Sequence, residues 1–140
     1  MKLLEELCHP DEEVFFRLYL EEDKGIFYAH WLGVPTQKDL QLAMHKGLNH
    51  LHQYDISQVL NDHTRHLGDW ADVCSWIRVL WTPKSIHNSL RYFAHVLPSK
   101  HKSTQETNFQ DMVHGAVCKT FRVEKDALDW LQSTQKKALA

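Results

Sequence analysis

Polar and ionisable side chains gather in one short run of this chain of 140 residues. The run combines a carboxylate, a guanidinium and two imidazoles within five positions, which is enough to bind a small anion or to assist proton transfer. An aspartate and a tryptophan follow where a helix is expected to begin. The candidate binding site therefore comprises Asn61, Asp62, His63, Thr64, Arg65, His66, Asp69 and Trp70.

Structural roles compete with chemical ones at several of these positions. Asn61 and Asp62 are residue types that commonly tie a turn through hydrogen bonds to the backbone, and Asp69 is explained by capping a helix. The two histidines are equally compatible with exposure to solvent. Arg65 separates the interpretations best, because an arginine in a loop has little structural purpose unless it is paired. We expect Arg65 and the histidines to give the site its function.

Common catalytic and metal-binding patterns are missing. No G-x-S-x-G, phosphate-loop or dinucleotide-binding glycine pattern occurs, and Cys74 falls within an expected helix, where a thiol usually acts as a small hydrophobic group. The 11 histidines show no H-E-x-x-H, H-x-H or mixed Cys/His spacing, so we predict neither a metal nor a cofactor. One enzymatic alternative stays open, a hydrolase or isomerase that uses Asp62 and His63.

The elements that position the run follow from hydrophobic periodicity. Val14–Glu21 alternates between apolar and polar residues, a turn with glycine follows at 22–25, and residues 26–32 form a second apolar run. These features predict an antiparallel hairpin. Thr36, with Asp39 three residues later, forms the pattern that begins a helix. The predicted buried stripe of this helix consists of Leu40, Met44, Gly47, Leu48 and Leu51.

The remaining chain predicts alternating strands and helices. A short third strand ends at Asn61 and Asp62 and leads into the polar run, which we interpret as a loop at the carboxyl end of the strand. Asp69 begins the next helix. Later elements are a helix from 69 to 82, strands at 91–97 and 116–121, a weak helix at 104–112 and a terminal helix at 124–134.

This order predicts an α/β fold with a mixed sheet of about five strands covered by about four helices. The amino-terminal hairpin is antiparallel, and the crossovers through helices make the remaining strands mainly parallel. We expect a partly ordered leader over residues 1–13, one domain over residues 14–135 and a tail over residues 136–140.

Four stretches of sequence carry a resemblance to a known family. They are W-L-G-V-P-T-x-x-D before the first helix, V-L-N-D at the end of the third strand, G-D-W at the next helix start and the terminal A-L-D-W-L. The chain resembles a standalone bacterial member of the sulfate-transporter and anti-sigma-factor-antagonist (STAS) family, in the branch grouped with CRAL-TRIO-like lipid-binding domains. The resemblance spans residues 14–134.

The resemblance implies a regulatory or ligand-binding module and not an enzyme. In the signalling branch, a phosphorylatable serine follows the third strand and is read by a kinase partner. This chain has no serine in the corresponding run, where only Thr64 could accept phosphate. Asp62 and Asp69 would repel an added phosphate and Arg65 would attract it, so electrostatics does not decide that role.

Composition excludes some partners. A formal net charge of -2 and a pI of about 6.6 give no basic footprint for nucleic acid. Three widely spaced cysteines without a C-x-x-C pair favour a reducing cytoplasm, and no apolar run reaches the length of a membrane span. We expect a protein partner or self-association as a homodimer through Trp76, with a small amphipathic or lipid-like ligand as the alternative.

Overall fold

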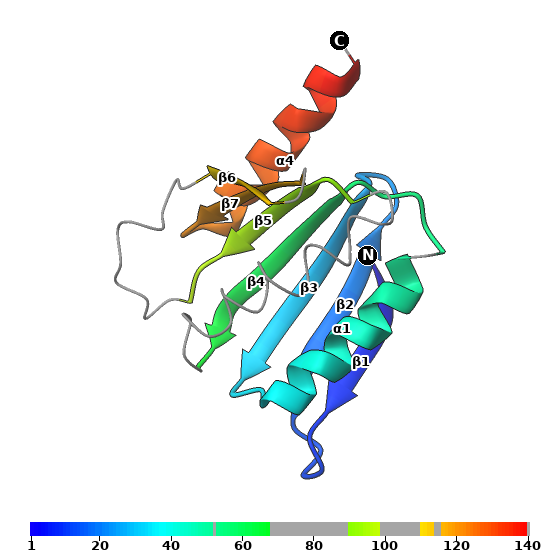
Figure 1. Ribbon diagram of the computed structural model, residues 1–140, viewed down its shortest axis with the longest axis vertical. Helices are drawn as coiled ribbons and strands as arrows, with labels where there is room; N and C mark the ends of the chain where they lie inside the picture. The colour runs from blue at the N-terminus through cyan, green and yellow to red at the C-terminus, as the bar shows by residue number, and fades with distance from the viewer. Residues whose placement is uncertain (52, 68–89, 99–109, 114–115, 140) are drawn as a thin grey trace.

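The computed structural model describes residues 1–51, 53–67, 90–98, 110–113 and 116–139. Within these ranges seven strands form one mixed sheet in the order β1-β2-β3-β4-β5-β7-β6, and two helices pack on it (Figure 1). The sequence predicted about five strands and four helices. The elements are β1 Lys2–Cys8, β2 Val14–Glu21, β3 Ile26–Gly33, α1 Gln37–Leu51, β4 Gln58–His66, β5 Tyr92–Val96, β6 Gln110–Val113, β7 Ala116–Phe121 and α4 Glu124–Leu139.

The amino-terminal half is an antiparallel meander followed by a helix. The predicted hairpin is confirmed, because β2 and β3 pair antiparallel around a turn in which Gly25 has a φ of +67°. The predicted leader is wrong for Lys2–Cys8, which forms β1 and pairs antiparallel with β2. Leu7 is buried in this strand, so the apolar residues of the segment attach it to the core.

Helix α1 begins as the sequence predicts. The Thr36 backbone N–H donates to Asp39 Oδ2 at 2.8 Å, and the Asp39 N–H donates to Thr36 Oγ1 at 3.1 Å. This reciprocal pair satisfies two backbone donors that a helix start otherwise leaves without partners. The helix lies across the face of the sheet formed by β1 and β2 (Figure 1). Its residues Leu40, Ala43, Met44, Gly47 and Leu51 are buried there.

Strand β4 corrects the main structural prediction for the polar run. Residues 61–66 are not a loop, because β4 extends from Gln58 to His66. Parallel pairing with β3 continues to Gly33 and His66, and pairing with β5 continues to Asp62 and Val96. Backbone hydrogen bonds to neighbouring strands therefore override the weak strand propensity of this polar sequence.

The carboxyl-terminal elements complete the other face. Strand β5 lies between β4 and β7 in parallel pairing, as predicted for an interior strand. Residues 110–113 form β6 and not the end of a helix, whereas the predicted helices at 69–82 and 104–109 lie outside the described residues. Helix α4 covers β4, β5 and β7 on the side opposite α1, with Ala127 and Leu131 fully buried (Figure 1).

Candidate functional site

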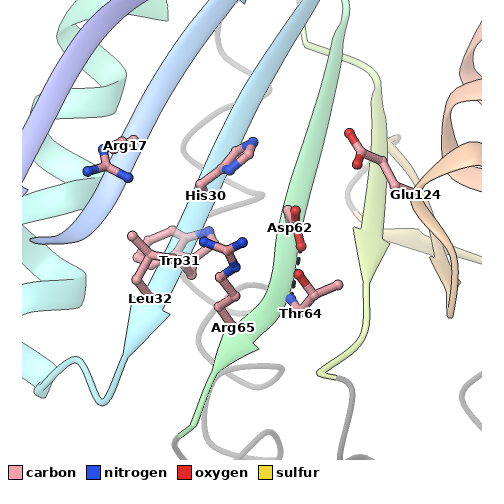
Figure 2. Close-up of a pocket in the computed structure, with 8 residues that line it drawn as sticks. All are labelled: Arg17, His30, Trp31, Leu32, Asp62, Thr64, Arg65 and Glu124. Carbon is pink, nitrogen blue, oxygen red and sulfur yellow. Dashed lines mark hydrogen bonds between the residues drawn. The ribbon is translucent and has the colours of Figure 1, made fainter.

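A pocket of about 340 Å³ lies on the α4 side of the sheet, near the carboxyl ends of β3 and β4 (Figure 2). This is the size of a small-ligand site. Most of its lining side chains are charged or polar. The lining residues are Arg17, His30, Trp31, Leu32, Asp62, Thr64, Arg65 and Glu124.

One row of polar residues crosses four strands and supplies three of these side chains. The register pairs Glu6 with Arg17, Arg17 with His30, and His30 with Asp62. Arg17 Nε donates to Glu6 Oε2 at 2.8 Å, and this hydrogen bond raises the pKa of Arg17. The row therefore presents one neutralised arginine, an imidazole and a carboxylate along the wall of the pocket.

An irregularity in β4 brings further side chains to the same side. One residue of β3 lies between His30 and Leu32, whereas two residues of β4 lie between their partners Asp62 and Arg65, so β4 carries an extra residue. Asp62 Oδ1 accepts the backbone N–H of Thr64 at 2.9 Å across this bulge. As a result, Asp62, Thr64 and Arg65 all line the pocket.

Of the charged side chains that line the pocket, Arg65 is the one whose charge is most accessible to a ligand. It is exposed, and its guanidinium extends into the space between Trp31 and Asp62 in Figure 2. Among the described residues, the guanidinium of Arg65 has no hydrogen bond or ion pair, although Asp62 lines the same pocket. Its five N–H donors are thus available to a planar acidic group.

A buried polar cluster occupies the opposite face of β4. Asn61 and His63 are fully buried, and His66 and His95 are nearly so. The Nδ1 atoms of His63 and His66 lie 3.2 Å apart, and the ring centroids of His63 and His95 are 6.4 Å apart. Register explains the position of His95, which pairs with Asn61 on the neighbouring strand.

Trp31 joins this cluster to the pocket. Its indole stacks on the His63 ring with a centroid distance of 5.8 Å and an angle of 8°. Its Nε1–H donates to Asn61 Oδ1 at 3.1 Å, and the same residue lines the pocket. The pocket and the buried cluster thus share a wall.

Burial of His63 and His66 disfavours the protonated, charged form of both imidazoles. Burial lowers the pKa of His63 well below 6.5, and charge repulsion from His95 and His66 lowers it further. Burial also lowers the pKa of His66. Neutral imidazoles fit the short contact between the two Nδ1 atoms, because one ring can donate while the other accepts.

Comparison with known proteins gives one structural relative. The chain is similar to the solved structure of an uncharacterised DUF3478 family protein with a SpoIIAA-like fold from Shewanella loihica PV-4. The match has 19% sequence identity and a TM-score of 0.50, and it covers 83% of this chain and 91% of that one. The fold is SpoIIAA-like, which is a STAS-like fold. No family model matches the sequence, and no curated protein matches it.

The SpoIIAA-like fold divides the sequence-predicted site between two faces. Asp62, Thr64 and Arg65 line the pocket. Asn61, His63 and His66 belong to the buried cluster, so the histidines are not exposed to solvent. Asp69, Trp70 and Trp76 lie outside the described residues.

Sequence reasoning missed the part of the pocket that other elements supply. Arg17 and His30 belong to the hairpin, and Glu124 is the first residue of α4. The turn at 22–25 sets the register that places Arg17 beside His30, so this pair could have been found from the hairpin alone. Glu124 gave no comparable signal, because only tertiary packing brings α4 to β4.

The described part of the fold offers neither a metal-binding cluster nor a membrane-spanning helix. These residues contain no group of three or more His, Cys, Asp or Glu side chains placed to hold a metal ion. No helix among them is long and apolar enough to cross a membrane.

Proposed function

We propose that this protein is a non-enzymatic regulatory module of the STAS-like type that binds an acidic group of a protein partner in the pocket. The observation that carries the proposal is Arg65, which lines the pocket without an ionic partner among the described residues. An arginine in that state can form two parallel hydrogen bonds with a carboxylate or phosphate group. The SpoIIAA-like fold supports a module of this kind by analogy only.

The distribution of charge limits how the acidic group enters. The two arginines and His30 lie toward β2 and β3, whereas Asp62 and Glu124 lie toward β5 and α4 (Figure 2). An acidic group is attracted to the first side and repelled from the second. We therefore place it between Arg65 and His30.

The enzymatic alternative receives little support from the described geometry. Asp62 lines the pocket, whereas His63 is fully buried in the cluster on the other face of β4. The two side chains cannot act on one substrate from these positions. Thr64 is also a poor phosphate acceptor here, because Asp62 already bonds to its backbone N–H and would repel the phosphate.

A carrier of a lipid-like molecule is less favoured than an acidic partner. Such a carrier needs an apolar cavity for the hydrocarbon part of its ligand. Trp31 and Leu32 are the apolar residues in the lining of this pocket, and the other six residues are polar or charged. The observed chemistry suits a small charged group better than an acyl chain.

An NMR titration with sulfate tests the anion site directly. We expect the backbone amides of His30, Thr64 and Arg65 to shift on addition of sulfate, and the shifts to disappear in Arg65→Gln. Lys38→Gln serves as the matched control, because Lys38 is an exposed cation at the start of α1 on the other side of the sheet. Equal shifts in wild type and Arg65→Gln would contradict the assignment of Arg65.

Photo-crosslinking in cells tests whether the acidic group belongs to a protein. A photoreactive amino acid at Leu32, which lines the pocket, should capture a discrete partner. The same residue at Leu42, which is an exposed position on α1, is the control. Capture at Leu32 should be lost when Arg65→Gln is added. Capture that persists after that change would argue against recognition through the pocket.

A further inference from the structure

The pocket and the His63–His66 pair lie on opposite faces of the same bulged segment of β4. Asp62, Thr64 and Arg65 face the pocket, while His63 and His66 alternate with them and are buried on the α1 side. Trp31 contacts both faces, since it lines the pocket and stacks on His63. A change in the distance between the two imidazoles would therefore move residues that shape the pocket.

The contact between the histidines depends on one shared proton. Two Nδ1 atoms 3.2 Å apart can form a hydrogen bond only when one carries hydrogen and the other offers its lone pair. A first added proton leaves this bond in place but creates a buried charge. A second added proton puts two N–H groups in opposition and removes the bond.

The described residues that pack around the pair are mostly apolar. His66 and His95 face His63 from β4 and β5, and Cys118 of β7 is buried on the same side. The buried residues of α1 are apolar or glycine. Carboxylates on that side already have histidine partners: Asp39 with His9 and Glu5 with His50, each at 3.2 Å. A charge on the pair is costly because both rings are buried, unless water reaches them.

We propose that the His63–His66 pair acts as a proton-sensitive latch. The hydrogen bond between the two rings holds the pocket in the shape that binds the acidic group. When the pair is neutral, the hydrogen bond holds the bulge of β4, and Trp31 stays stacked on His63. When the pair gains protons, the rings separate toward water, and the bulge and Trp31 shift with them. Binding of the acidic group and protonation of the pair then oppose each other, as two linked equilibria. This inference rests on the proposed anion site.

Protonation of a second histidine, His30, changes anion binding in the opposite direction, so the sign of the change shows which histidine is responsible. His30 lines the pocket itself, so a proton on His30 strengthens the binding of an anion. Protons on His63 and His66 weaken it. A proton on His30 and a proton on the pair therefore change anion binding in opposite directions, and substitution can separate them.

The experiment measures sulfate affinity by NMR at pH 7.5 and pH 4.5, because sulfate does not change its own charge over that range and the lower pH lies well below the ordinary pKa of histidine. In His30→Gln we expect binding to weaken about fivefold or more on acidification, which is the range of a typical coupling between sites. In His66→Gln the amide can still bond to His63 but cannot gain a proton, so the weakening of sulfate binding on acidification should disappear. Folding at both pH values is checked from the dispersion of the amide spectrum.

A separate measurement reports the latch without any ligand. Long-range proton–nitrogen spectra of the imidazoles at pH 7.5 should show complementary tautomers, with hydrogen on Nδ1 of one ring and on Nε2 of the other. The indole N–H resonance of Trp31 should shift with the same midpoint as these rings. His45→Gln, at an exposed site on α1, should change neither.

The outcomes distinguish the two proposals. If sulfate shifts no pocket resonance at either pH, the anion site itself is wrong. If sulfate binds but wild type, His30→Gln and His66→Gln all strengthen equally on acidification, the site stands and the latch is overturned. Identical tautomers in the two rings would also overturn the latch.

Discussion

Asp62 and His63 are neighbours in the chain and lie on opposite faces of β4. The carboxylate of Asp62 lines a polar pocket, and the imidazole of His63 is fully buried under Trp31. This separation decides the function that the two residues can serve. In the described geometry Asp62 braces the bulge through its bond to Thr64, and His63 supports the wall of the pocket by stacking on Trp31.

Removal of the Trp31 hydrogen bond should destabilise the fold. In Trp31→Phe, the buried Oδ1 of Asn61 loses its indole donor, and the ring stacked on His63 becomes smaller. We expect the free energy of unfolding, measured by urea denaturation, to fall by about 1–3 kcal/mol. Trp130→Phe on α4 is the matched control, because its indole is only half-buried. An equal loss in both variants would contradict the role given to the Asn61 contact.

Stability should fall as the pH drops below about 6.5. Burial lowers the pKa of His63 in the folded state, whereas the unfolded chain keeps the ordinary value of 6.5. Below 6.5 the unfolded state therefore binds more protons, and each extra proton costs the folded state ~1.4 kcal/mol per pH unit until the lower folded pKa is reached. The free energy of unfolding is measured between pH 8 and pH 5.

A substitution tests the origin of that pH dependence. His63→Gln should flatten the profile below pH 6.5 relative to wild type, even if the variant is less stable at every pH. His45→Gln, which changes an exposed histidine, should leave the slope as it is. A wild-type slope that survives in His63→Gln would place the responsible group elsewhere.

Loss of the α1 cap should cost a modest amount of stability. Thr36→Ala removes the hydroxyl that accepts the Asp39 N–H, while Asp39 keeps its contact with His9. We expect the free energy of unfolding to fall by about 1 kcal/mol. Gln41→Ala, at an exposed position inside the same helix, should cause no loss. No difference between the two variants would show that the cap is dispensable.

Gln58 should control the attachment of α4 to the sheet. Its buried Nε2 donates to the Leu131 carbonyl oxygen at 2.7 Å and to Thr134 Oγ1, and its Oε1 accepts Gln135 Nε2 at 2.9 Å. In Gln58→Leu these polar groups of α4 lose a partner, at a cost of about 1–3 kcal/mol. Hydrogen exchange of amides 127–134 should accelerate, while exchange in α1 stays unchanged. Gln53→Leu, at an exposed position, is the control.

Local patterns predicted the elements that depend on neighbouring residues. Alternation and a glycine turn define the β2–β3 hairpin, and the Thr36–Asp39 pair defines the start of α1. The apolar character of residues 92–96 on both faces, except for His95, marks an interior strand. In each case the decisive contact lies within a few residues or follows from hydrophobic periodicity, so the sequence contains the information.

The sequence by itself determined the mixed α/β fold and the segment that carries the site. Tertiary structure decided the conformation and faces of that segment, because the backbone partners of β4 come from β3 and β5. Once Asn61 to His66 is paired as a strand, alternation sends Asp62 and Thr64 to the pocket and His63 to the core, and the bulge brings Arg65 to the pocket side. A polar run that resembles a loop in isolation is thus stabilised as a strand by its neighbours, and Trp31 and His95 bury the residues that it turns inward.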